Sequence, residues 1–160
     1  MKGWNNVSSV AEIEKPLIKE NIEGSSISSA AEDALIGLLE KCKEENLQVL
    51  FVATPWEIGE KYQKKNKYIG EIIESYGFRF LDCNLYLDEI GLDFMHDFYN
   101  RRHTNMAGAE KVTQFIGEYI LDHYDLEAEH STEVETDWNN MLTLYNAQAE
   151  EIRAAILNAE

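Results

Sequence analysis

The sequence contains little cysteine and few basic residues. The two cysteines, Cys42 and Cys83, argue against a disulfide framework, and neither CxxC spacing nor nearby histidines indicate a zinc site. Fourteen lysines and arginines stand against 30 aspartates and glutamates, and the resulting net charge of −16 would repel a phosphate backbone. We therefore expect no nucleic-acid partner, no structural metal and no cofactor.

Long apolar runs are also missing. No stretch of 18 apolar residues exists, and the residues from Met1 to Asn6 do not resemble the apolar core of a signal peptide. The sequence therefore predicts a soluble, cytoplasmic polypeptide with no membrane segment and with reduced thiols.

What the chain does have is 44% apolar residues in a length of 160, which is enough for the core of one domain. Residues 1–27 read as an irregular lead-in, 28–124 as an α/β core, and 125–160 as an acidic linker and terminal helix. This last part holds nine carboxylates against Arg153 alone, which is typical of a solvated face or of a helix that meets a partner.

Hydrophobic periodicity predicts alternating helices and strands. The expected helices span 28–45, 57–76, 106–124 and 133–158, and the expected strands span 47–53 and 78–82, with a short helical turn near 85–90. Helix, strand, helix, strand is the pattern of a parallel sheet, and the apolar run 47–53 suits a strand covered on both faces. Two parallel strands leave open edges, so we expect further strands from the irregular residues, from a second copy in a homo-oligomer, or from segments that this chain lacks.

Reactive side chains are densest between Asp93 and Ala109, with two histidines, two aspartates, two arginines and two asparagines. Most of them fall in the long connection of residues 83–105 that precedes the predicted helix 106–124. Loops this long are uncommon in compact domains unless they have a function. The structural alternative is that Asn105 merely caps the next helix, that Gly108 allows close packing, and that the charges are solvated.

The stretch DFYNRRHTN (97–105) followed by GAEK (108–111) resembles the last conserved block of the SGNH, or GDSL-type, hydrolases, in particular their cell-envelope branch. The segments Leu50–Trp56 and Phe80–Asn84, together with Trp138 and Tyr145, are also similar to this family. The resemblance implies part of a three-layer α/β/α, flavodoxin-like fold with parallel strands, followed here by an acidic helix. It implies hydrolysis or transfer of ester or acyl groups, with an acylated carbohydrate or another ester as substrate.

In that family a serine attacks the acyl carbonyl, a histidine is the general base, and an aspartate three residues earlier orients the histidine. His103 matches the base, but Asn100 occupies the aspartate position. An asparagine can hold a ring nitrogen, yet it cannot stabilise imidazolium and can select the wrong tautomer. Asp97 is the alternative orienting group, provided that the loop folds it inward.

The serine block is the larger departure from the family. Gly24-Ser25-Ser26 is present, but it follows a poor strand and leads directly into a helix, so a helix-entry turn is favoured over a nucleophile at Ser25 or Ser26. The leading hypothesis is a truncated or degenerate SGNH-like domain that is not catalytically complete alone. The alternatives are a non-catalytic, oligomerising interaction module and, more weakly, a metal site formed by His96, Asp97 and His103.

Overall fold

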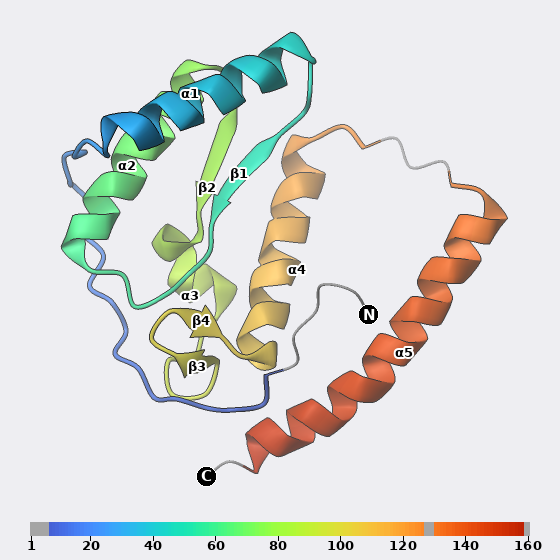
Figure 1. Cartoon of the computed structure of the whole chain (residues 1–160). Coiled ribbons are helices and arrows are strands. Elements are labelled where there is room, and N and C mark those ends of the chain that lie inside the picture. The colour runs from blue at the N-terminus through green and yellow to red at the C-terminus, as the bar shows by residue number, and fades with distance from the viewer. Residues whose placement is uncertain (1–6, 127–129, 159–160) are drawn as a thin grey trace. The chain divides into compact units, whose positions relative to one another are not determined.

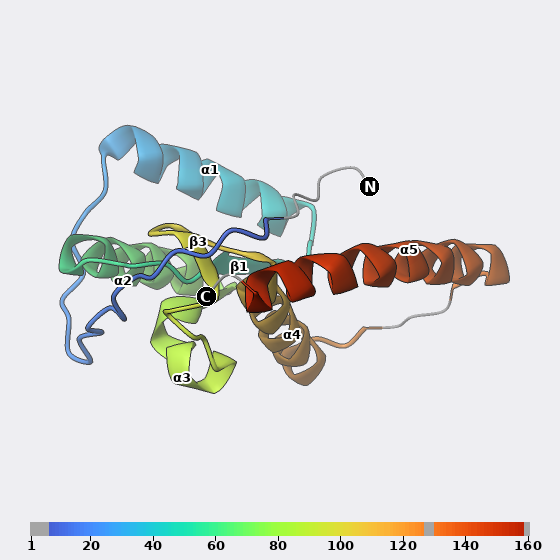
Figure 2. The ribbon, with the colours of Figure 1, turned by 90° about the horizontal axis from the view of Figure 1, so that it is seen from below.

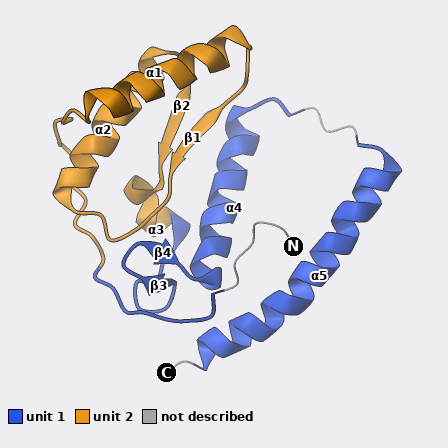
Figure 3. Cartoon of the chain, in the orientation of Figure 1, with its two compact units in different colours: residues 1–14, 90–160 blue, residues 15–89 orange. Residues whose placement is uncertain are grey.

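The computed structural model describes residues 7–126 and 130–158, and these divide into two compact units. Unit 1 combines Met1–Glu14 with Ile90–Glu160, and unit 2 is the continuous segment Lys15–Glu89 (Figure 3). The chain is a mixed α/β protein, as expected. Each unit is built around its own elements.

Unit 2 contains the predicted parallel pair of strands. Its elements are α1 (Ser29–Glu44), β1 (Leu50–Ala53), α2 (Glu60–Ser75), β2 (Arg79–Asp82), the short 3-10 helix η1 (Cys83–Tyr86) and most of α3 (Leu87–Ile90) (Figure 1). β1 pairs with β2 in parallel, in a register that runs from Leu50 opposite Arg79 to Ala53 opposite Asp82. The expected helix–strand–helix–strand order is therefore confirmed.

Local signals place the ends of these elements. Ser28 caps α1 by accepting a hydrogen bond from the Ala31 N–H, and Asn46 follows the helix with a φ of 52°. Gly77 ends the turn after α2 with a φ of 87°, a conformation that glycine adopts without steric cost. Figure 2 shows α1 in a layer of its own, apart from α2 and β1.

The expectation of a strand buried on both faces is wrong for β1. None of its four residues is buried, and Val52 is exposed. The strand is also shorter than the apolar run 47–53, since β1 begins at Leu50. The sheet of unit 2 has only two strands among the described residues, and this leaves β1 without the neighbours that would cover it.

Unit 1 contains β3 (Phe98–Asn100), β4 (His103–Thr104), α4 (Met106–His123) and α5 (Thr132–Leu157). β3 and β4 form a small antiparallel hairpin with an irregularity between Phe98 and Asn100. Residues 7–13 lie along this region, because the Ala11 N–H donates to the Phe98 carbonyl at 2.8 Å and the Met106 N–H donates to the Val7 carbonyl at 3.1 Å. This antiparallel pair was not expected from the sequence.

A small apolar core joins the start of α4 to the second half of α5. Met106, Ala149 and Ile156 are buried together, with Val10, Ala107, Tyr145 and Ile152 packed around them. Glu110 reinforces this contact by accepting hydrogen bonds from the Tyr145 hydroxyl at 2.8 Å and from the Arg153 guanidinium at 2.6 and 3.0 Å. Within the described parts of the chain, no helix combines the length and apolar character needed to cross a bilayer.

Candidate functional site

The loop between Asp93 and Asn105 is held by a buried carboxylate. Asp97 is 3% exposed, and its Oδ2 accepts hydrogen bonds from the Asp93 N–H at 2.7 Å and from Lys111 Nζ at 2.6 Å. Its backbone carbonyl accepts from the Asn105 N–H at 2.9 Å. Asp97 therefore ties the loop to α4, and it binds Lys111 instead of taking the alternative role of orienting His103.

Gly108 allows the helix to approach this carbonyl. A Cβ atom at Gly108 would lie 2.3 Å from the Asp97 carbonyl oxygen, closer than any side chain could come without moving the backbone. Asn105 completes the junction as the N-cap of α4, because its Oδ1 accepts from the Gly108 N–H and its Nδ2 donates to the His96 carbonyl. The expected cap and the expected close packing are both present, and they fix where β4 ends and α4 begins.

His103 contacts Asn100, the residue three positions earlier. The Nδ1 atom of His103 lies 3.0 Å from Asn100 Oδ1, and the same oxygen accepts a hydrogen bond from the Arg102 N–H at 2.8 Å. A backbone N–H can only donate, so the Arg102 contact requires the oxygen, and not the amide nitrogen, of Asn100 to face this point. Because that oxygen can only accept, the proton of the neutral ring resides on Nδ1.

In this arrangement the asparagine does not select the wrong tautomer of His103. Once Nδ1 carries the proton, Nε2 carries the lone pair, and this is the tautomer that a general base uses. The Tyr99 ring stacks on the imidazole at a centroid distance of 5.4 Å and an interplanar angle of 16°, which further limits its rotation. His103 is exposed, and among the described residues no side chain bonds its Nε2 atom.

A second histidine in the loop forms a different pair. His96 Nδ1 lies 2.8 Å from Asp93 Oδ2, and the hydrogen bond from His96, with one from the Met95 N–H, lowers the pKa of Asp93. The three side chains of the metal hypothesis thus have separate contacts: Asp93 for His96, Lys111 for Asp97 and Asn100 for His103. No cluster of three or more metal-ligating side chains occurs in the described ranges.

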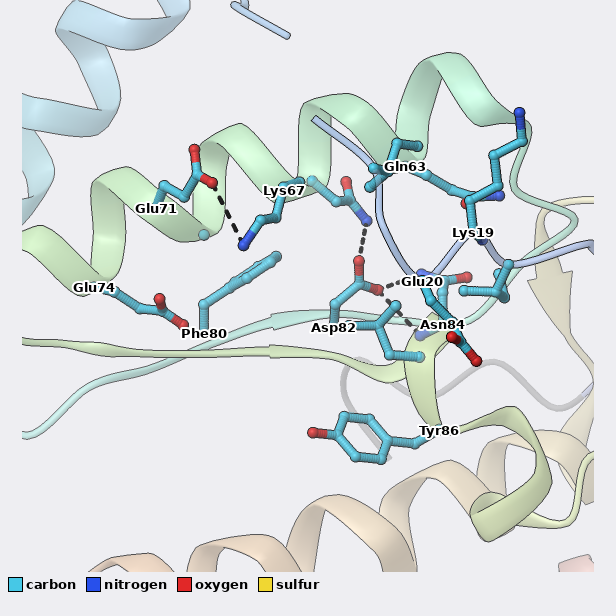
Figure 4. Close-up of a pocket in the computed structure, with 15 residues that line it drawn as sticks. Lys19, Glu20, Gln63, Lys67, Glu71, Glu74, Phe80, Asp82, Asn84 and Tyr86 are labelled. Atoms are coloured by element: carbon cyan, nitrogen blue, oxygen red, sulfur yellow. Dashed lines mark hydrogen bonds and ion pairs between the residues drawn. The ribbon is translucent and has the colours of Figure 1, made fainter. Parts of the chain in front are cut away.

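Unit 2 contains a cleft of about 510 Å³ beside β2 (Figure 4). Its lining includes Asp82 and Asn84 at the carboxyl end of β2, and open α/β sheets bind ligands at the carboxyl ends of their strands. The wall is formed by residues of the lead-in, of α2 and of the β2–η1 segment: Ile18, Lys19, Glu20, Ile22, Gln63, Asn66, Lys67, Gly70, Glu71, Glu74, Phe80, Asp82, Asn84, Leu85 and Tyr86. This cleft was not predicted, although Asp82-Cys83-Asn84 at the end of a predicted strand is a signal that could have indicated it.

The buried polar groups of this cleft bond mainly to one another. Asp82 Oδ1 accepts from the backbone and side-chain N–H groups of Asn84, and Asp82 Oδ2 accepts from Asn66 (Figure 4). Asn84 Oδ1 in turn accepts from the Trp56 N–H, and its Nδ2 donates to the Thr54 carbonyl. These contacts join the ends of β1 and β2, so the Asp82–Asn84 pair serves the fold.

Other candidate nucleophiles in unit 2 have structural surroundings. The Ser25 N–H donates to the Lys64 carbonyl at 3.0 Å, which sets Gly24-Ser25-Ser26 against α2 just before α1 begins. Both cysteines are buried, and burial, together with the nearby Asp82 carboxylate, raises the pKa of Cys83 to about 12. Cys83 is thus a protonated thiol near neutral pH and a poor nucleophile.

Comparison with family models, with curated proteins and with solved structures finds no match to this chain. The resemblance to the SGNH hydrolases therefore stays a prediction from the sequence.

Proposed function

We propose that this chain supplies the general base of an SGNH-type site for hydrolysis or transfer of acyl groups. The observation that carries the proposal is the contact between His103 Nδ1 and Asn100 Oδ1, which leaves Nε2 as a bare acceptor on an exposed ring. We also propose that β1 and β2 are part of a larger parallel sheet in a three-layer α/β/α domain.

In the proposed reaction His103 Nε2 takes the proton of a serine hydroxyl as its oxygen attacks the acyl carbonyl of an ester. The proton then passes to the leaving alcohol, and water or another alcohol releases the acyl group. Acylated carbohydrates are the substrate class that the resemblance favours. No residue of this chain is assigned as the serine, so we propose that the chain is not catalytically complete alone.

The neutral amide should weaken this base. An aspartate would stabilise the imidazolium that forms during proton transfer, whereas the Asn100 oxygen contributes only a dipole. Anchoring by Asp97 and Asn105 supports the geometry, because the backbone around His103 is fixed on both sides. We therefore propose that His103 is correctly oriented as a base but has a reduced driving force for proton transfer.

The first test measures the tautomer of His103 by nitrogen NMR on protein with labelled histidine. The wild type should show the proton on Nδ1, while Asn100→Leu should shift His103 toward the Nε2–H form that free histidine prefers. Asn140→Leu, on the exposed surface of α5, is the control and should leave the spectrum unchanged. A wild-type ring with its proton on Nε2 would remove the observation on which the proposal depends.

The second test concerns catalysis. The chain alone should show no saturable hydrolysis of p-nitrophenyl acetate that depends on His103, since imidazole side chains give only a slow, linear background. If the genomic sequence upstream of the Met1 codon encodes a serine block in frame, the longer protein should be active, and His103→Gln should reduce kcat about 10³-fold or more. Saturable turnover by the chain alone, abolished in His103→Gln, would contradict the proposed incompleteness.

A non-catalytic interaction module is the second candidate, and one observation favours it. The amino-terminal half of α5 exposes Trp138, Met141 and Leu142, which are large apolar side chains that soluble proteins seldom expose together. This role and the role of His103 do not exclude each other.

A further inference from the structure

The helix α5 carries one apolar stripe, and only half of it is covered. Apolar and aromatic side chains recur every three or four residues along one face, at 134, 138, 141, 142, 145, 149, 152 and 156. The second half of the stripe, from Tyr145 onward, packs on the start of α4. The first half, which we call the open stripe, consists of Val134, Trp138, Met141 and Leu142, and these residues are 39%, 69%, 47% and 54% exposed.

From Trp138 onward, the open stripe lies in a segment that is free of charge. Residues 138–149 (WNNMLTLYNAQA) form the longest run in the sequence without aspartate, glutamate, lysine or arginine. Almost all of this run lies on the helix surface, where its polar residues are asparagine, threonine and glutamine. A solvated helix in such an acidic protein would be expected to carry charges here, so their absence indicates a surface that something neutral and apolar covers.

We propose that the open stripe is a self-association surface that pairs with the same stripe of a second copy of this chain. Two copies with a net charge of −16 repel one another over most of their surface, and this run is where neither copy presents charge. A basic partner would have no carboxylate to contact within the run. An identical uncharged helix face fits it.

The distribution of carboxylates fixes the direction of pairing. Glu133, Glu135 and Asp137 precede the run, and Glu150 and Glu151 follow it. A parallel pair would place each carboxylate beside its own copy. An antiparallel pair about a two-fold axis near Trp138 instead sets Val134 opposite Leu142 of the second copy. It also places the three carboxylates that precede the run opposite the uncharged residues 139–143.

The size of the surface sets the strength of the pairing. The uncharged run spans about 18 Å of helix, or roughly three turns. Stable interfaces bury about 800 Å² on each partner, and three turns of one helix offer less than this. The dimer should therefore form reversibly, with a monomer–dimer equilibrium that depends on protein concentration.

Sedimentation velocity over a wide concentration range tests the proposal. The wild type should shift from monomer toward dimer, whereas Met141→Glu and Leu142→Glu should remain monomeric because they place carboxylates in the contact. Asn140→Glu, which adds the same charge on the opposite face of the helix, should dimerise like the wild type. A wild type that stays monomeric, or a dimer that tolerates both stripe substitutions, would overturn the proposal.

A cross-link distinguishes this geometry from other dimers and does not depend on a charged substitution. In Trp138→Cys two new thiols should meet at the axis, and mild oxidation should yield a covalent dimer. Asn140→Cys is the control and should not cross-link, while Cys42 and Cys83 are buried and should remain unreacted. Equal cross-linking of the two variants would contradict the antiparallel pairing. Neither result depends on the role proposed for His103, so the two proposals can fail separately.

Discussion

The loop that carries His103 and the cleft beside β2 are built from similar side chains, but they differ in what remains available for bonding. In the cleft, the side chains of Asp82 and Asn84 form hydrogen bonds with each other and with the backbone just after β1. In the loop, Asp97 and Asn105 make the structural contacts, and this leaves His103 Nε2 with its lone pair. Polar residues at a strand end therefore do not identify a reactive site by themselves. A reactive side chain also needs a donor or acceptor atom that is free to bond a substrate.

The largest expected effect is a loss of stability in the loop that carries His103. Gly108→Ala places a Cβ atom against the Asp97 carbonyl, and both are backbone-anchored, so the clash cannot be relieved by a side-chain rotation. We expect the free energy of unfolding to fall by about 3 kcal/mol or more, measured by urea denaturation. Gly117→Ala in the same helix meets no atom within 4 Å and should stabilise by up to ~1 kcal/mol. Equal effects of the two substitutions would show that the close approach at Gly108 is not tight.

The next effect tests whether the cleft residues are structural. Asn84→Ala leaves the partly buried Trp56 N–H without its acceptor and removes the link between the ends of β1 and β2. We expect a loss of about 2.5 kcal/mol in the free energy of unfolding. Asn100→Ala, in the more exposed His103 loop, should lower the free energy of unfolding by no more than about 0.5 kcal/mol. It should nevertheless disturb the tautomer of His103. A larger loss of stability in Asn100→Ala than in Asn84→Ala would contradict the structural role assigned to Asn84.

A somewhat smaller effect is expected at the ion pair that holds the loop. Lys111→Met leaves the buried Asp97 carboxylate without its cation, although Lys111 is 39% exposed and water can partly replace it. We expect a loss of about 2 kcal/mol, below the range for fully buried pairs. The double variant Asp97→Asn, Lys111→Met should cost less than the sum of the two single variants, as measured in a double-mutant cycle. Additive losses would mean that the two side chains do not interact.

The smallest effect concerns the wall of the cleft, which exposed ion pairs hold in place. Hydrogen bonds from Lys19 and Lys64 lower the pKa of Glu60 from 4.5 to about 2. A lowered pKa means that this contact is fully present above pH 4.5 and is lost as the pH falls through about 2. A carboxyl NMR titration of Lys19→Ala should show the Glu60 midpoint rising back toward 4.5, and Lys15→Ala serves as the control because Lys15 pairs with Asp88. An unchanged midpoint in Lys19→Ala would contradict the contact.

Several elements were predictable because their causes are local. Ser28, Asn105 and Gly77 end or begin helices where the sequence indicated, and the order of helices and strands predicted the parallel pairing of β1 and β2. The cap at Asn105 and the close packing at Gly108 were the structural alternative for this loop, and both are present. The hairpin of β3 and β4 could not be predicted, since its strands are only three and two residues long and its extended backbone is bonded to the distant lead-in residue Ala11.

The sequence by itself determined where the helices begin and end, which strands run parallel, and which histidine has an asparagine three residues before it. These features follow from capping, periodicity and spacing, which act over a few residues. The tertiary structure decided that Asp97 binds Lys111, that the Arg102 N–H turns the Asn100 oxygen toward His103, and that half of the α5 stripe is covered. Such outcomes depend on which donor meets which acceptor in space, and residue spacing alone does not specify that.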